Sequence, residues 1–87
     1  MPRTERHLRV IVLEPFAGQF FAGTAAFDLA ARNLFGVVRA LDALGPGFAE
    51  AAEAGAAIAV DGAMVADWSQ PLVEAQEILI VPKIAGG

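Results

Sequence analysis

Two apolar runs lie near the two ends of the chain. The first run covers residues 8–13, finishes with four β-branched or leucine residues, and is stopped by Glu14 and Pro15. The second covers residues 78–81 and is stopped by Pro82. Consecutive apolar residues without alternation are typical of strands that are buried on both faces. Both runs are therefore expected in the centre of one sheet.

A helix is predicted between these two runs. Its apolar residues follow the spacing i, i+3, i+4, i+7 and i+10 and form one stripe: Leu34, Val37, Val38, Leu41 and Leu44. Asn33 is a suitable N-cap, and Gly45-Pro46-Gly47 ends the helix because proline cannot continue it. Residues 48–54 predict a second, shorter helix that Gly55 closes.

The remaining segments predict strands and turns. Three further strands are expected, at residues 25–30, 57–60 and 63–66. Asp61-Gly62 is a tight hairpin signal between the last two of them. Residues 16–23 are expected to form a turn region, and residues 67–76 a loop before Glu77 opens the last strand.

The order strand, strand, helix, strand, strand, strand predicts an α+β domain of the β-grasp type. This fold has a mixed sheet of four or five strands with one main helix packed on one face. The first and last strands should pair in parallel at the centre, because the chain between them supplies the long crossover that parallel pairing requires. Residues 1–82 are expected to form a single domain, followed by a tail at residues 83–87.

Composition narrows the classes of function. A chain of 87 residues supports one core, and 56% hydrophobic residues favour a folded domain over a disordered one. A net charge of −4 argues against nucleic-acid binding and favours a basic patch on a partner. The absence of cysteine excludes disulfides, thiolate metal sites and a cysteine nucleophile. No apolar run approaches the roughly 18 residues of a membrane span. A soluble, cytoplasmic protein is expected.

Isolated polar and aromatic residues give no catalytic constellation. His7 has no second ligand or base in the sequence, so it is interpreted as a surface residue. Lys83, the only lysine, either meets acidic groups on a partner or is a solvated charge. Trp68 is expected to cover the core rather than to bind a ligand, and Glu50 and Glu53 to lie on a solvated helix face rather than in a metal or acid–base site. We expect no metal site and no catalysis by the chain alone.

One face of the predicted sheet should be left uncovered. Both central strands are apolar on both sides, and a single helix covers only one face of a small sheet. An exposed apolar patch usually marks an interface, so we expect the second face to dock partner proteins. Self-association is an alternative, as is partial cover of this face by Phe16, Phe20 or Phe21.

Four short motifs together resemble the sulfur carriers of molybdopterin and thiamine synthesis, which are ubiquitin-like proteins: Ala59-Val60-Asp61-Gly62, Pro71-Leu72, Glu77-Ile78 and Ile84-Ala85-Gly86-Gly87. With the order of elements, the resemblance covers nearly the whole chain. Asp61, Ala75 and Lys83 depart from the residues common in those families. The length and the segment 48–55 are more similar to the molybdopterin synthase small subunit, whereas the ending is more similar to the thiamine carrier.

The resemblance implies a reaction at the terminal carboxylate. A ubiquitin-activating-type enzyme would adenylate Gly87 with ATP and magnesium, and a sulfur donor would then displace AMP to leave a thiocarboxylate. The catalytic subunit of a synthase would receive the sulfur. Molybdopterin synthesis is the favoured pathway, and thiamine synthesis is the second choice. The carrier itself would hold no permanent cofactor. A protein modifier that forms isopeptide bonds, and a binding module with an inert tail, are the alternatives.

The residue types of the tail suit an extended arm that reaches into the active site of a partner protein. Gly86 and Gly87 have no side chain to obstruct a narrow channel, and Ala85 keeps the approach slim. From Pro82 onward the chain can span roughly 20 Å at about 3.3 Å per residue. Pro82 and Ile84 are expected to anchor the base of the arm. The expected binding residues are Ile80, Pro82, Lys83, Ile84, Ala85 and Gly86, with Gly87 as the reactive residue.

Overall fold

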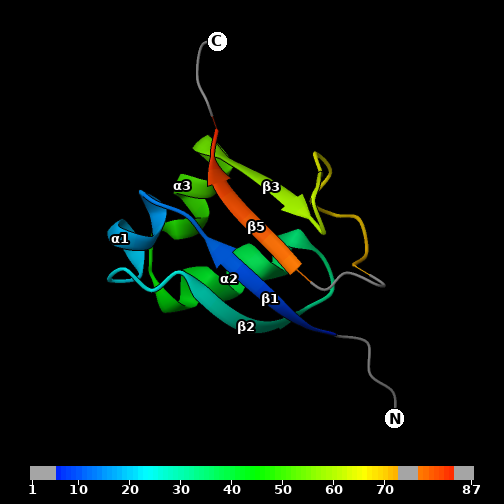
Figure 1. The fold of residues 1–87 in the computed structure, drawn as a ribbon, viewed down its shortest axis with the longest axis horizontal. Coiled ribbons are helices and arrows are strands. Elements are labelled where there is room, and N and C mark those ends of the chain that lie inside the picture. The colour runs from blue at the N-terminus through cyan, green and yellow to red at the C-terminus, as the bar shows by residue number, and fades with distance from the viewer. Residues whose placement is uncertain (1–5, 73–76, 84–87) are drawn as a thin grey trace.

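The computed structural model describes residues 6–72 and 77–83, which form an α+β structure around one mixed sheet (Figure 1). The five strands are β1 (Arg6–Val12), β2 (Ala26–Ala31), β3 (Ala56–Val60), β4 (Ala63–Met64) and β5 (Glu77–Pro82). The helices are α1 (Phe16–Phe20), α2 (Leu34–Leu44) and α3 (Phe48–Gly55). The strand order in the sheet is β2-β1-β5-β3-β4.

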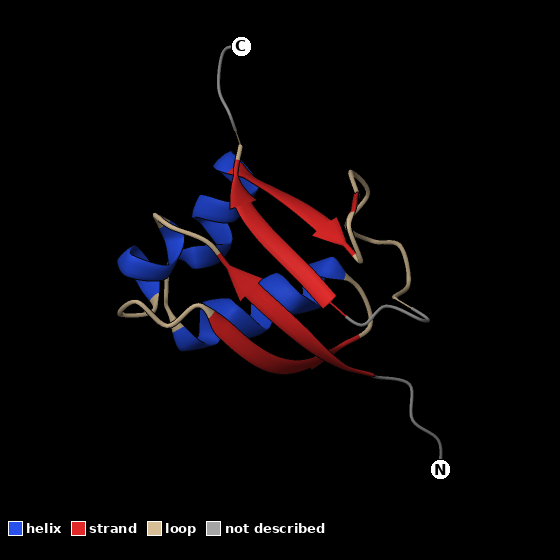
Figure 2. Ribbon diagram, viewed as in Figure 1, coloured by secondary structure: helices blue, strands red, loops and turns tan. Residues whose placement is uncertain are grey.

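The first and last strands pair in parallel at the centre of the sheet. Val10 pairs with Ile78 and Val12 pairs with Ile80, while β2, β3 and β4 join through antiparallel pairings. The helices α2 and α3 lie together on one face of the sheet, as Figure 2 shows. The predicted mixed sheet with central first and last strands is therefore confirmed, and two helices rather than one lie against this face.

The core lies between the sheet and these helices. Strand alternation directs one set of side chains from β1 and β5 toward the helices, and all of its members are 0% exposed: Leu8, Val10, Val12, Ile78 and Ile80. The largest buried side chains are Phe48, Leu8, Leu34, Leu41, Ile58, Ile78 and Ile80. Both helices thus hold β5 in place through its buried side.

Local capping explains the limits of α2, which match the prediction for residues 34–44. The Asn33 side chain accepts a hydrogen bond from the Gly36 N–H at 2.9 Å, as predicted for an N-cap. At the other end, Asp42 Oδ1 accepts hydrogen bonds from the N–H groups of Gly47 and Ala49 at 3.0 and 2.9 Å. The carboxylate of α2 therefore fixes the start of α3.

The turn region predicted at residues 16–23 is wrong in part, because Phe16–Phe20 form the helix α1. Phe16 and Phe20 contact the ring of Phe48 edge-on, at centroid distances of 5.8 and 5.7 Å, and Phe21 contacts it at 5.2 Å. Phe48 is the first residue of α3, and this helix lies on the covered face of the sheet. The three phenylalanines therefore join the core cluster and do not cover the open face.

The strand predicted at residues 63–66 is shorter in the structure, where β4 ends at Met64. The Val65 N–H still donates to the Ile58 carbonyl at 2.9 Å. The chain then turns toward the start of α2, where the Trp68 carbonyl accepts hydrogen bonds from the N–H groups of Leu34 and Phe35 at 3.0 and 3.2 Å. These contacts with α2 draw the segment away from β3.

The other strands differ from the prediction at their ends. The strand β1 begins at Arg6, two residues before the predicted start, and ends at Val12 rather than Leu13. The strand β2 starts and ends one residue later than predicted, β3 starts one residue earlier, and β5 ends one residue later. Strand ends depend on pairing with neighbours, which the pattern of one strand does not specify.

The predicted hairpin turn is confirmed between β3 and β4. Asp61 and Gly62 both have positive φ, 49° and 91°, as a two-residue hairpin loop requires. Asp61 also contacts the start of β5 through two hydrogen bonds. Its N–H donates to the Glu77 carbonyl at 2.9 Å, and its Oδ1 accepts from the Glu77 N–H at 2.9 Å. The turn is thereby tied to the first residue of the central strand.

Candidate functional site

The base of the predicted arm is the end of β5. Pro82 is half-buried and pairs with Ala56, and the Lys83 N–H donates to the Gly55 carbonyl at 2.7 Å. The side chain of Lys83 is exposed. Pairing with β3 thus extends past Pro82 and fixes the backbone up to Lys83.

Ile80 has a different role from the one predicted. Its side chain is 0% exposed, and its strand neighbours are Val12 and Ile58 on the face that the helices cover. A partner docking on the surface cannot contact this side chain. Ile80 anchors β5 in the core, so its assignment as a binding residue is wrong for direct contact.

The other predicted arm residues, Ile84, Ala85, Gly86 and Gly87, lie outside the described residues.

An apolar strip occupies the open face of the sheet beside the end of β5. Alternation places the residues between the buried positions of β1, β3 and β5 on this face. Its members are Ile11, Leu13, Ala57, Ala59, Leu79, Val81 and, on β4, Met64. Leu13 is 40% and Met64 64% exposed, Ala59 is nearly buried at 7%, and the other four members are half-buried. We call these seven residues the open-face strip.

Charged residues occupy the opposite end of the same face. His7 Nδ1 lies 3.5 Å from Asp28 Oδ1, and Arg9 Nε lies 4.0 Å from Glu77 Oε2. All four side chains are largely exposed, so these pairs contribute little to stability. The open face is therefore divided into a charged half where β1 and β5 start and an apolar half near Lys83.

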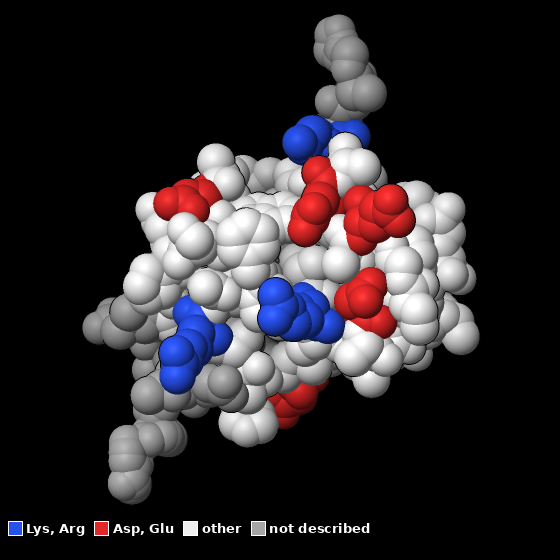
Figure 3. All heavy atoms as spheres, turned by 180° about the vertical axis from the view of Figure 1, so that it is seen from behind, with Lys and Arg blue, Asp and Glu red and all other residues white. Residues whose placement is uncertain are grey.

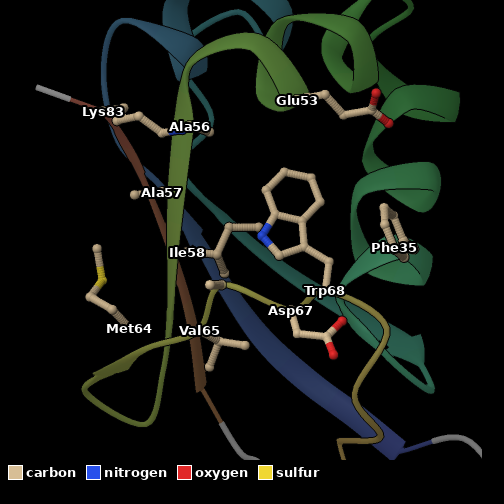
Figure 4. A pocket seen from close by; sticks show the side chains of 11 residues that line it. Phe35, Glu53, Ala56, Ala57, Ile58, Met64, Val65, Asp67, Trp68 and Lys83 are labelled. Carbon is tan, nitrogen blue, oxygen red and sulfur yellow. The ribbon is translucent and has the colours of Figure 1, made fainter. Parts of the chain in front are cut away.

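A groove of about 680 Å³ lies along the outer edge of β3 (Figure 4). Trp68, Phe35 and Glu53 line it on the helix side of β3, and Ala57, Met64 and Lys83 line it on the other side. Trp68 also packs against the core, as predicted. The prediction for Trp68 did not include the groove, because its formation depends on where the chain leaves β4.

On the face that carries the helices, the described charged side chains are of both signs. Figure 3 shows acidic and basic side chains interspersed over the face that carries the helices. Glu50 and Glu53 are exposed on α3, as expected for a solvated helix face. Among residues 6–72 and 77–83, no group of three or more His, Cys, Asp or Glu side chains could hold a metal ion.

The carboxylate of Asp67 has a shifted pKa. Asp67 Oδ1 accepts hydrogen bonds from the Ser69 hydroxyl at 2.6 Å and from the Ser69 N–H at 3.0 Å. Because both bonds stabilise the ionised form, they lower the pKa of Asp67 below its ordinary value, with the side-chain bond as the larger cause.

A scan of protein-family models and a search of curated proteins found no match. In the part of the chain that the structure describes, no helix has the length and apolar character needed to cross a membrane.

Proposed function

We propose that this protein is a ubiquitin-like sulfur carrier of the β-grasp type that donates sulfur in cofactor biosynthesis. The observation that carries the proposal is the position of the open-face strip, which lies next to Lys83 at the end of the central strand β5. An enzyme that modifies the end of a chain must hold the folded body while the last residues enter its active site. A docking surface beside the base of the arm meets that need.

The proposed chemistry occurs at the Gly87 carboxylate. One carboxylate oxygen attacks the α-phosphorus of ATP, and pyrophosphate leaves, so that an acyl adenylate forms. Hydrosulfide, or an equivalent sulfur donor, then attacks the carbonyl carbon, and the bond to AMP breaks. The products are AMP and a thiocarboxylate in which sulfur replaces one oxygen. No electron transfer is needed when the donor is hydrosulfide.

In this proposal the partners carry the catalytic groups. A ubiquitin-activating-type enzyme binds ATP and magnesium, and a synthase subunit accepts the sulfur, with molybdopterin favoured as the product and thiamine next. The open-face strip would bind each of these partners in turn. Pro82 and Lys83 hold the base of the arm through their pairing with Ala56 and Gly55, so the reactive end starts from a fixed point.

The proposal is tested by intact-mass spectrometry. The full chain is incubated with a candidate activating enzyme, ATP, magnesium and sodium sulfide. The expected product differs from the starting protein by the exchange of one oxygen for sulfur, and omission of ATP abolishes it. A chain extended by one alanine after Gly87 is the matched control and is expected to remain unmodified. Failure of exchange with every candidate enzyme, or equal modification of the extended chain, would refute the proposal.

The alternative functions give different outcomes. A protein modifier would form isopeptide bonds with lysines of other proteins in cell extract. Tryptic peptides carrying an Ile-Ala-Gly-Gly remnant on lysine would reveal these bonds, because trypsin cleaves after Lys83. A binding module with an inert tail would keep its cellular activity after deletion of Gly86 and Gly87. A sulfur carrier is expected to lose activity on that deletion.

A further inference from the structure

The outer edge of β3 is only partly paired. The strand β4 pairs with Ala59 and Val60, and the Val65 N–H reaches the Ile58 carbonyl. Within the described ranges, no strand lies beside Ala56 and Ala57 on this side of the sheet. Because backbone groups alternate along a strand, the Ala56 C=O and the Ile58 N–H face the same edge as the Ile58 C=O. An added strand can pair with one acceptor and one donor there.

The groove beside this edge has a preformed aromatic wall. The Trp68 carbonyl holds the first turn of α2 through the N–H groups of Leu34 and Phe35. The Trp68 ring contacts Phe35 edge-on at a centroid distance of 5.7 Å. Two of the four large apolar residues that the structure leaves exposed, Phe35 at 46% and Met64 at 64%, line this groove. Apolar surface is therefore concentrated along the incompletely paired edge.

Negative charge lies on the tryptophan side of the groove. Figure 4 shows the Trp68 indole between the side chains of Glu53 and Asp67, whereas Lys83 lies on the other side of β3. An aromatic face flanked by carboxylates attracts an ammonium or guanidinium group. The two hydrogen bonds from Ser69 keep Asp67 ionised in weakly acidic solution, because they lower its pKa.

We propose that this edge binds an extended segment of another protein, which adds as a strand beside Ala56 and Ile58 and directs an arginine or lysine toward Trp68 between Glu53 and Asp67. Backbone hydrogen bonds supply the pairing, and the basic side chain supplies the selectivity. Side chains alternate along the added strand, so the residues directly before and after the basic residue face Ala57 and Met64. This binding does not involve the chemistry at Gly87.

Charge distinguishes this partner from a second copy of the chain. If two copies paired their β3 edges antiparallel, the helices of both copies would lie on the same face of the joined sheet. Glu53, before β3, would then approach Asp67 of the other copy, which follows β4. Like charges that face each other oppose such a dimer, whereas a basic peptide neutralises both carboxylates.

Trp68 reports the binding directly, because it is the only tryptophan. The full chain is titrated with the blocked peptide acetyl-Thr-Val-Arg-Val-Thr-amide, and Trp68 emission is recorded. A saturable change is expected, and the peptide with Glu in place of Arg should bind about tenfold more weakly or worse. The Arg peptide with methylated backbone nitrogens on the arginine and both valines should also lose affinity. The backbone N–H groups that face β3 belong to the arginine in antiparallel pairing and to a valine in parallel pairing.

Variants test the groove itself. The double substitution Glu53→Gln/Asp67→Asn should weaken binding of the Arg peptide by about tenfold, while Glu50→Gln, an exposed acid on α3 outside the groove lining, should leave it unchanged. Equal affinity for the Arg and Glu peptides, or for the methylated peptide, would overturn the proposal. So would the absence of saturable binding, or a concentration-dependent dimer in sedimentation that changes Trp68 emission without peptide.

Discussion

Ser69 stabilises the ionised carboxylate of Asp67 at the surface of the protein. Asp67 lies in an exposed turn, and the Ser69 hydroxyl and N–H both donate to its Oδ1. The folded-state pKa of Asp67 is lowered by these bonds, so its contribution to stability is present above the unfolded pKa of about 3.9. That contribution is lost as the pH falls through the lower pKa of the folded state.

Substitution of Ser69 by alanine should raise the pKa of Asp67 toward its ordinary value. The change removes the hydroxyl donor, which is the larger cause of the shift, and leaves the backbone N–H in place. The measurement is the pH titration of the Asp67 carboxyl carbon by NMR in the folded protein. Ser69→Thr keeps a hydroxyl and is the matched control. Equal pKa values for Asp67 in the two variants would show that the hydroxyl does not cause the shift.

The sequence could predict the role of some single residues near the site but not of others. The capping role of Asn33 follows from its residue type and position, because a helix start needs a local acceptor. The pairing of Lys83 with Gly55 does not follow from either residue, since it depends on the register of β5 against β3. The reactive positions of the arm remain predictions from the resemblance, because residues 84–87 are outside the described part.

At the scale of elements, α1 was the segment that the pattern did not predict. It has five residues, too few for helical spacing to be distinguished from a turn that contains three phenylalanines and glycines. Its position depends on tertiary contacts with Phe48 and with the end of α2. The hairpin β3–β4 was predicted from Asp61-Gly62, but the early end of β4 arises from the contact of Trp68 with α2, which no local pattern contains.

The close contact between the end of α2 and α1 predicts a stability difference between two glycines. A Cβ added at Gly45 would overlap the Phe20 carbonyl oxygen and lie 2.8 Å from Phe21 Cε1, so Gly45→Ala should lower the free energy of unfolding by about 1–3 kcal/mol. A Cβ at Gly55 would meet nothing within 4 Å. Gly55→Ala should therefore be neutral or stabilising, by up to about 1 kcal/mol.

Urea unfolding monitored by Trp68 fluorescence measures both glycine variants against the parent protein. Equal unfolding free energies for Gly45→Ala and the parent would mean that α1 moves aside at no cost, contrary to the packing described above.

At the scale of the whole molecule, helices cover one face of the sheet and leave the other face open. The sequence was sufficient for the α+β class, the mixed sheet and the central parallel strands, because two largely apolar runs near the ends of the chain leave few other arrangements. It also indicated an open apolar face. The division of that face into a charged half and an apolar half depends on strand register, and the groove depends on the length of β4.

Adjacent residues of β5 should separate stability from docking. Ile80 faces the core, so Ile80→Ala should lower the free energy of unfolding by about 2–5 kcal/mol. Leu79 is half-buried on the open face, so Leu79→Ala should cost less stability but slow the exchange of oxygen for sulfur by the activating enzyme. Unfolding in urea and initial rates of intact-mass change measure the two effects. A Leu79→Ala protein that is modified at the parent rate would exclude the open-face strip as the docking surface.

The hydrogen bonds between Asp61 and Glu77 also determine where the far end of β5 lies. Residues 78–81 are apolar on both faces, so polarity hardly distinguishes the observed register from one shifted by a residue. Such a slip would move Lys83 about 3.3 Å along the strand and turn its side chain to the opposite face. The paired hydrogen bonds of Asp61 select one alignment. A hairpin at one end of the sheet thereby sets the reach and the orientation of the chain at the other.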